Sequence, residues 1–418
     1  MKFQTVRGMR DFLPEQAKKK QFIEDFIRKV FESYGFEPLQ TPIVEDFELL
    51  AAKGSGGEAI KEEIYYFKDK GERELGLRYD LTVPLARVVA SNPMLARPFK
   101  RYQISPVYRY DRPQAKRYRE FTQADVDIVG ALGVYADFEC VQVAVDVMRG
   151  LGLDFKVRVN NRKTLEALAI EMGISKENIV DAFRSLDKLD KIGRGGVEKE
   201  LKEKGIETRI LGQIEANSFE EMKHYIKNEP ALAELEELLE LSKKNGYLEV
   251  EFDLSLARGL EYYTGTVFEI AISDGPSVGA GGRYDKLIGL YGGQETPATG
   301  ISFGVDRLFD ALEGSLVIGP NTDVFIIPIG AGSFAEGFLL ASAFRKARVN
   351  AEIDLMGRNV KKNFEYANKR GISFAIVLGE DEVRGKKFKV KDLVSGEERG
   401  FSFGEEARAA LFVKGRER

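Results

Sequence analysis

The sequence predicts an α+β unit built on a mostly antiparallel sheet, a helical insert within that unit, and a C-terminal α/β domain. Three observations lead to this fold class. Two long stretches, 99–110 and 117–130, alternate in character as half-buried antiparallel strands do. The region from about 164 to 245 is highly charged, helical in pattern and poor in aromatic residues. From residue 322 onward, strand patterns alternate with helical patterns, which is typical of a small α/β domain.

The N-terminal elements are a helix and a proline-bearing strand. Apolar residues recur at helical spacing over 16–35 and predict an amphipathic helix. The run 37–44 is strand-like, but Pro38 and Pro42 argue against a central strand, because proline cannot donate to a ladder. An edge strand or an interface is therefore expected there. After the two long strands, residues 137–150 predict a helix with one apolar face.

Strand-like, glycine-rich sequence resumes at residue 247 and continues to about 304. A helix over 305–312 is expected to close the first unit. The C-terminal domain is expected to hold helices near 334–347, 360–370 and 404–413.

Composition excludes several classes of protein. The chain has 418 residues, 43% hydrophobic and 31% charged, as in an ordinary soluble globular protein. A net charge of -4 makes histone-like proteins and acidic tails improbable and confines any nucleic-acid contact to local basic patches. One Cys and one His exclude an intramolecular disulfide, a Cys-based zinc site and a His-rich metal site. With no apolar stretch typical of a secretory signal or a membrane span, the expected compartment is the cytoplasm.

The strongest local charge excess lies in residues 97–119, which hold eight basic residues and one acidic residue. Arg109 ends the first long strand, and Arg117 lies in or beside the hairpin loop. Guanidinium groups can grip phosphates in bidentate fashion, and interleaved aromatics such as Phe121 could stack on a purine. The alternative is a solvated hairpin surface. The basic run 384–391 leaves a similar choice between a protected edge strand and an RNA-binding patch.

A second constellation consists of polar residues in strand context. Asp80 and Thr82 lie in LRYDLTVP, and Gln123, Asp125 and Asp127 share one strand face through the period of two. Carboxylates on such a face could hold an ammonium or imidazole group. Equally, the face could be turned to solvent or paired with nearby arginines.

A third constellation is glycine-rich. Residues 274–304 contain nine glycines, which allow the backbone to approach a ligand or another strand closely or form tight turns. Arg283, Tyr284 and Arg307 stand out among the side chains. The GxSxG pattern at 300–304 does not indicate an esterase, because the only histidine, His224, precedes the serine in the charged insert.

Five segments along the chain resemble segments of the class II aminoacyl-tRNA synthetases. RGMRDFLP with the Pro42 strand resembles the N-terminal segment and the dimer-forming motif 1, and PVYRYDRPQAKRYREFTQADVDIVG resembles motif 2. TGISFGVDRL resembles motif 3. LARGLEYYTGTVFE and SVGAGGRYDKLIGLYGG resemble the two segments particular to histidyl-tRNA synthetases, here of the archaeal/eukaryotic type. Position 261 departs slightly, with Glu where many members carry Asp.

The resemblance implies a class II catalytic domain over 1–163 plus 246–318, a helical insertion domain over 164–245 and an anticodon-binding domain over 322–418. It implies Arg258 and Arg109 as the catalytic residues, with Arg258 stabilising the transition state at the α-phosphate. It assigns no metal ligand. The implied histidine-binding residues are Asp80, Thr82, Arg109, Gln123, Asp127, Arg258, Tyr262, Tyr263 and Tyr284. The implied ATP-binding residues are Arg109, Arg117, Phe121 and Arg307.

The implied reaction joins L-histidine to its tRNA through histidyl-adenylate, with ATP as substrate, Mg²⁺ on its outer phosphates, and a homodimer as the assembly. Two alternatives stay open from the sequence. One is a non-catalytic regulatory subunit that senses histidine for ATP phosphoribosyltransferase. The other is a class II enzyme of different amino-acid specificity.

Overall fold

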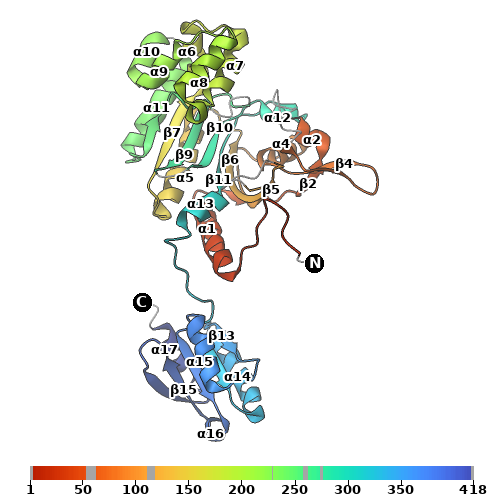
Figure 1. Ribbon diagram of the computed structural model, residues 1–418, viewed down its shortest axis with the longest axis vertical. Helices are drawn as coiled ribbons and strands as arrows, with labels where there is room; N and C mark the ends of the chain where they lie inside the picture. The colour runs from red at the N-terminus through yellow and green to blue at the C-terminus, as the bar shows by residue number, and fades with distance from the viewer. Residues whose placement is uncertain are drawn as a thin grey trace. The chain divides into compact units, whose positions relative to one another are not determined.

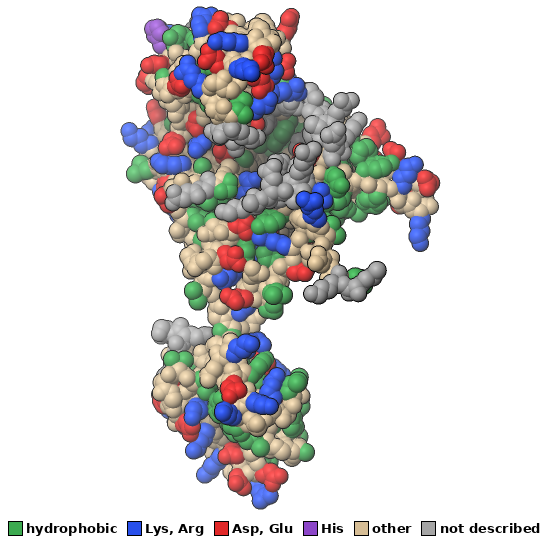
Figure 2. All heavy atoms as spheres, viewed as in Figure 1, with side chains coloured by type: hydrophobic (Ala, Val, Ile, Leu, Met, Phe, Trp, Pro, Cys, Tyr) green, Lys and Arg blue, Asp and Glu red, His purple; other side chains and the backbone are tan. Residues whose placement is uncertain are grey.

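The computed structural model describes residues 3–52, 63–110, 118–227, 229–257, 262–273 and 276–415 (Figure 1). The chain forms two compact units, Met1–Leu316 and Val317–Arg418. Among the described helices, none combines the length and apolar character that crossing a bilayer requires. In the view of Figure 2, basic side chains are interspersed with acidic ones on the surface of each unit.

The first unit is built on one large sheet. In its described part, eight strands pair in the order β1-β5-β6-β11-β10-β9-β7-β8. Every neighbouring pair is antiparallel except β1–β5 and β7–β8, which lie at the two edges. The strands are β1 (Glu37–Pro38), β5 (Phe99–Tyr108), β6 (Glu120–Val129), β7 (Phe155–Asn161), β8 (Val250–Phe252), β9 (Thr266–Ile272), β10 (Ser277–Arg283) and β11 (Ala298–Gly304). The predicted mostly antiparallel sheet is confirmed.

The two long predicted strands lie side by side, second and third in the order of this sheet. β5 and β6 pair from Phe99–Val129 to Tyr108–Glu120 without a break. Because side chains alternate between faces, one face of β6 and β11 is apolar and carries Val126, Ile128 and Phe303. Three helices cover this face: α1 (Pro14–Ser33), α5 (Val134–Gly150) and α13 (Val305–Leu312) (Figure 1). The opposite face of the same strands is left for polar groups.

The proline-bearing segment does lie at an edge. Pro38 is in β1, the edge strand beside β5. The predicted strand 37–44 is nevertheless divided, because residues from Val44 enter a second sheet ordered β2-β4-β3. This small sheet comprises β2 (Val44–Asp46), β3 (Tyr66–Lys68) and β4 (Glu74–Leu77), with α2 (Phe47–Ala51) beside it.

The expected strand context of Asp80 and Thr82 is wrong. β4 ends at Leu77, and Thr82 is the first residue of α4 (Thr82–Ser91). An Asp80 carboxylate oxygen accepts a hydrogen bond from the backbone N–H of Val83 at 3.0 Å. Helix starts leave such N–H groups without intrahelical partners, and Pro84 within the first turn is compatible with a helix start. LRYDLTVP is therefore a strand-to-helix turn.

The charged region 164–245 is helical, as predicted, and lies between β7 and β8. Its buried residues, including Leu168, Leu201 and Leu235, continue the core of the large sheet. Its elements are α6 (Arg162–Glu171), η1 (Lys176–Asn178), α7 (Ile179–Leu186), α8 (Leu189–Glu203), α9 (Ile210–Ala216), α10 (Phe219–Tyr225) and α11 (Pro230–Lys244).

The second unit is the predicted α/β domain. Its sheet has the order β13-β12-β14-β15-β16, with the first three strands parallel and the last two antiparallel. β15, the basic run, is paired on both sides, so the proposed edge strand is wrong; β16 is the edge. The elements are β12 (Val324–Pro328), η2 (Ala331–Ser333), α14 (Phe334–Lys346), β13 (Ala351–Ile353), α15 (Val360–Lys369), β14 (Phe374–Leu378), α16 (Glu380–Arg384), β15 (Lys387–Asp392), β16 (Glu398–Ser402) and α17 (Glu406–Lys414).

A buried ion pair joins the sheet to α5. The Arg283 guanidinium, at the end of β10, donates to the Asp137 carboxylate at 2.8 and 3.2 Å and to the carbonyls of Ala131 and Gly133. The side chains of Arg283 and Asp137 are only 6% and 2% exposed. Arg283, singled out in the sequence, therefore has a structural role.

Arg283→Met should lower the free energy of unfolding by about 3 kcal/mol, because it leaves the Asp137 carboxylate buried without its partner. Urea unfolding measures this change. Arg149→Met is the matched control: the Arg149–Glu249 pair is also bidentate but more exposed, and its loss should cost under about 1 kcal/mol. Equal losses in the two variants would contradict the structural assignment of Arg283.

Candidate active site

A buried cluster of charges occupies the polar face of the large sheet. Arg101 on β5 faces Asp127 on β6, which in turn faces Gly300 on β11. The Arg101 guanidinium lies 2.6 Å from the Asp127 carboxylate, and Arg101 is fully buried. Asp125, the next residue on the same face, is 3% exposed. The predicted common face of Gln123, Asp125 and Asp127 is confirmed. Its two carboxylates are buried rather than turned to solvent, Gln123 is half-buried, and the alternative of pairing with a nearby arginine holds for Asp127.

Glycine makes room for the Asp127 carboxylate. A Cβ atom at Gly300 would lie 2.1 Å from an Asp127 carboxylate oxygen and 2.7 Å from the Val126 carbonyl. A Cβ atom at Gly282 would lie 2.6 Å from the Thr266 carbonyl and 3.0 Å from the Tyr263 ring. These two glycines of the 274–304 run therefore permit close approach.

Three tyrosines border the cluster. The Tyr284 hydroxyl donates to the Asp127 carboxylate, and burial together with that carboxylate raises the pKa of Tyr284 well above its ordinary value. The rings of Tyr262 and Tyr263 lie 4.4 Å apart, with their hydroxyls in hydrogen-bond contact at 3.2 Å. Burial and the neighbouring hydroxyl of Tyr262 likewise hold the pKa of Tyr263 high. Both Tyr263 and Tyr284 thus remain neutral hydrogen-bond donors near neutral pH.

The start of α4 brings a further carboxylate toward this cluster. Asp80 is 7% exposed and acts electrostatically on Asp125, Tyr79 and Tyr291. α4 packs against α12 (Leu287–Leu290), and Tyr284 belongs to the same small apolar cluster. The packing of α4 against α12 therefore holds three predicted site residues on one side of the polar face: Asp80, Thr82 and Tyr284.

Arg109 and Phe121 form a second part of the site. They lie at the far end of the β5–β6 hairpin, where the Arg109 guanidinium lies 5.2 Å from the centre of the Phe121 ring. The Nε of Arg109 donates to the Tyr79 carbonyl at 3.0 Å, immediately before Asp80. The structure therefore links Arg109 to the segment that carries Asp80. Arg307, at the start of α13, is exposed and donates to the Ser277 carbonyl at 2.5 Å.

Arg258 and Arg117, as well as Glu261, lie outside the described residues. Their predicted roles therefore stay predictions. The other predicted site residues all belong to the first unit.

Part of the basic run 97–119 is committed to contacts within the protein. Lys100 pairs with Glu139, and Arg101 pairs with Asp127. These two residues therefore act as ion-pair partners within the protein. Arg101 was not predicted as a site residue, because only the antiparallel register of β5 and β6 in the structure places it opposite Asp127.

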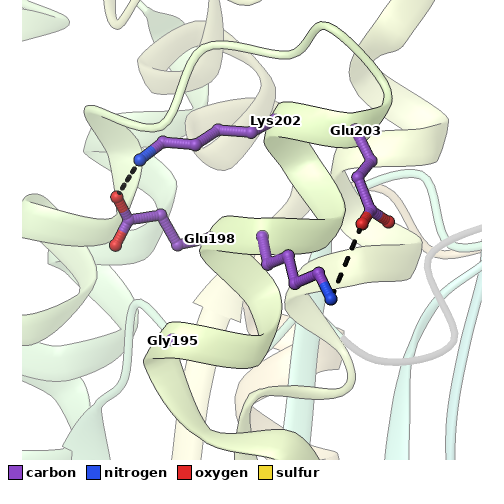
Figure 3. Close-up of a pocket in the computed structure, with 5 residues that line it drawn as sticks. Gly195, Glu198, Lys202 and Glu203 are labelled. Atoms are coloured by element: carbon purple, nitrogen blue, oxygen red, sulfur yellow. Dashed lines mark hydrogen bonds and ion pairs between the residues drawn. The ribbon is translucent and has the colours of Figure 1, made fainter.

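The structure also describes a surface hollow away from this site. It lies on α8 and is lined by Gly195, Glu198, Lys199, Lys202 and Glu203. Figure 3 shows the ion pairs Lys202–Glu198 and Lys199–Glu203 there, both spaced i,i+4 on the exposed helix. Such pairs are ordinary features of a solvated helix face. His224 is likewise exposed on α10, and Cys140 is buried in α5.

The environment of Asp125 shifts the pKa of its carboxyl group far above the ordinary value. Burial raises the pKa of Asp125 most strongly, Arg101 and a hydrogen bond with Ser302 lower it, and Asp127 and Asp80 raise it; the resulting pKa is about 7. These groups come from β5, β11, β6 and the turn before α4, and Tyr263 and Arg78 also interact electrostatically with Asp125. The polar face therefore holds one carboxyl group that is close to half-protonated at neutral pH.

In the unfolded chain the pKa of Asp125 is about 4, and in the folded protein it is about 7. Between these values the folded state binds more protons, so the free energy of unfolding should fall as pH rises, by at most about 1.4 kcal/mol per pH unit. Asp125→Asn should remove this slope in urea titrations across that range. Asp154→Asn, at an exposed position, should keep it. A slope unchanged by Asp125→Asn would contradict the assignment.

The sheet order, its buried polar face and the arginine–aromatic pair at the hairpin define a class II aminoacyl-tRNA synthetase. A family model described as histidyl-tRNA synthetase matches residues 8–308, and one described as anticodon binding domain matches residues 323–409. The chain belongs to the histidyl-tRNA synthetase family.

Relatives and a solved structure agree along nearly the whole chain. Histidine–tRNA ligase 2 of Shouchella clausii is 38% identical, over 96% of this chain and 98% of its own. Histidine–tRNA ligase of Aeropyrum pernix is 39% identical, over 96% of each chain. The crystal structure of histidyl-tRNA synthetase from Nostoc sp. PCC 7120 superposes with a TM-score of 0.86 at 31% identity, covering all of both chains.

Proposed function

We propose that this chain attaches L-histidine to its cognate tRNA in two steps, using ATP and forming histidyl-adenylate as the intermediate. It is a histidine–tRNA ligase. The observation that carries the proposal is the buried polar face, where Asp127 is held between Arg101 and Tyr284, within a chain of this family. An acceptor fixed in this way suits a side chain with ring N–H groups.

The histidine site is proposed on the polar face. Asp127, with its charge balanced by Arg101, would accept a hydrogen bond from an imidazole N–H. Asp80, held by the start of α4, would take the substrate ammonium. A wrong side chain would leave these buried polar groups unpaired, which can discriminate by roughly 10⁴. The full proposed set is Asp80, Thr82, Arg109, Gln123, Asp127, Arg258, Tyr262, Tyr263 and Tyr284.

The polar face also contains buried polar atoms without a hydrogen-bond partner. Among the described residues, Nε and Nη1 of Arg101, one carboxylate oxygen of Asp125 and the amide oxygen of Gln123 are buried without a hydrogen bond. Buried polar groups are almost always paired. A polar substrate, with the water it brings, would supply partners at this place.

The ATP site is proposed at the hairpin end of the sheet. Phe121 would stack on adenine, and Arg109 would bind the α-phosphate and the substrate carboxylate. Arg117 and Arg307 would bind the outer phosphates, where Mg²⁺ enters with the nucleotide. Among the described residues, no group of three or more His, Cys, Asp or Glu side chains is suited to a metal ion. Mg²⁺ would bind the phosphates as part of the ATP substrate.

Adenylate formation is an in-line attack of the histidine carboxylate on the α-phosphorus, with pyrophosphate leaving. The protein has little covalent chemistry to perform, so catalysis depends on positioning and on neutralising charge in the transition state. Arg109 and Arg258 are the proposed catalytic residues. The histidyl group then passes from the adenylate to the 3′ end of the tRNA, releasing AMP.

The wider assignments are proposals of the same kind. They comprise a catalytic domain over 1–163 plus 246–318, an insertion domain over 164–245, a domain over 322–418 that reads the anticodon, a homodimer, and the cytoplasm as compartment. The archaeal/eukaryotic type also belongs here, since the bacterial and archaeal relatives are about equally similar at 38% and 39% identity.

ATP–pyrophosphate exchange tests the proposed function directly. With purified protein, no tRNA and each of the twenty amino acids in turn, exchange should occur with histidine alone. Exchange with another amino acid would contradict the specificity. Saturable histidine binding without any exchange would favour the regulatory-subunit alternative, which the match of residues 323–409 to an anticodon-binding domain disfavours.

Arg258→Lys tests the transition-state role. The substitution should slow adenylate formation on the order of 10²-fold or more, because lysine cannot reproduce the guanidinium contacts. Histidine affinity should stay within about threefold. Single-turnover formation of labelled adenylate and equilibrium histidine binding measure the two quantities, with Arg149→Lys as a remote control. Parallel losses of rate and affinity would leave Arg258 with its histidine-binding role alone and contradict the transition-state role.

A further inference from the structure

The N-terminal segment 7–13 lies across two distant parts of the first unit, although it belongs to no helix or strand. Arg10 is its central contact. The Arg10 guanidinium donates to Asp306 at 2.9 Å and to Asp310 at 3.0 Å, both on α13. It also donates to the Tyr118 hydroxyl at 2.7 Å, just before β6. One side chain therefore joins three segments that are far apart in the sequence.

The Arg10 guanidinium also packs against two aromatic rings. Its central carbon lies 3.8 Å from the centre of the Tyr118 ring and 4.5 Å from that of Phe12. Phe12 in turn packs edge-on against Phe309 of α13, with ring centres 5.3 Å apart. Cation–π contact and a fork of charged hydrogen bonds together give a fixed geometry that lysine does not provide.

Backbone hydrogen bonds reinforce the same junction. The N–H of Arg119 donates to the Gly8 carbonyl at 2.8 Å, and the N–H of Arg109 donates to the Arg119 carbonyl at 2.9 Å. The N–H of Thr122 donates to the Asp306 carboxylate at 2.7 Å. The segment thus extends the hydrogen-bonded ladder beyond the β5–β6 hairpin.

The residues fixed in this way neighbour the proposed ATP contacts. Phe121 lies between Tyr118, which binds Arg10, and Thr122, which binds Asp306. Arg307 follows Asp306 directly. The buried Asp306 carboxylate, 4% exposed, receives Arg10, Lys20 and the Thr122 N–H. The Arg10 junction therefore acts together with the Gln123–Gly304 strand pairing on the spacing between the adenine-stacking residue and the outer-phosphate arginine.

We propose that Arg10 is a positioning residue for ATP: it fixes the start of β6, with Phe121, relative to α13, with Arg307. This inference rests on the proposed function of those two residues. Arg10 itself does not touch the reacting atoms. Its role is distinct from fold stability, because α1 and α13 are also joined through the buried apolar core around Phe31 and Leu308.

The test separates ATP binding from histidine binding and from folding. Arg10→Lys keeps the charge but loses the fork that contacts Asp306 and Asp310 together. It should raise the KM for ATP in pyrophosphate exchange by about tenfold and leave the KM for histidine within about twofold. Asp310→Asn, which removes one partner of Arg10, should shift the same constant in the same direction by a smaller factor. Arg149→Lys is the control and should change neither constant. Arg149 also forms bidentate contacts and lies beside an aromatic ring, that of Tyr247, but it contacts neither Arg10 nor its partners.

Equal increases in both KM values, or a fall in melting temperature with both KM values unchanged, would overturn the positioning role. If Arg10→Lys does not fold, Asp310→Asn decides the question by the same criteria. If the wild-type protein shows no histidine-dependent exchange, the proposed function has failed. Calorimetric titration with MgATP then tests Arg10 separately: weaker ATP binding in Arg10→Lys supports the inference, and unchanged binding overturns it.

Discussion

The Asp127 carboxylate is the group on which the rest of the first unit depends. A buried carboxylate must be paired and hydrogen-bonded, and here Arg101 supplies the charge while Tyr284 supplies a hydroxyl donor. Gly300 leaves the room that this carboxylate occupies, because a Cβ atom there would lie 2.1 Å from it. The central sheet is thus arranged around one anionic acceptor whose surroundings are already fixed before substrate arrives.

The two faces of the sheet have different roles. Strand alternation places Val126 and Phe303 against α1, α5 and α13, and places Asp125 and Asp127 on the opposite face. The apolar face provides a rigid support, and the polar face carries the chemistry. Because both sets come from the same strands, movement of the core would move the site, and the site acquires its precision from the packing beneath it.

The nucleotide end of the site has a different construction. Arg109 follows the last residue of β5. Phe121 pairs with Val107 of β5 but lies beyond the Gln123–Gly304 end of the β6–β11 pairing. The N-terminal segment ties the β5–β6 hairpin to α13 through Arg10 and Asp306. The histidine end is therefore held by burial, and the ATP end by a network of partly exposed charges and rings.

Local sequence patterns determined the elements of this protein. The period of two predicted β5, β6 and the shared face of Gln123, Asp125 and Asp127, the prolines predicted an edge strand, and the charged helical region was visible from composition. The tertiary structure alone decided which charges meet. Along the chain Arg101 resembles any arginine of a basic run, and Asp80 resembles a strand residue. Arg101 became an internal partner, and Asp80 a helix-start carboxylate, because strand register and helix packing bring together groups that local patterns describe only one at a time.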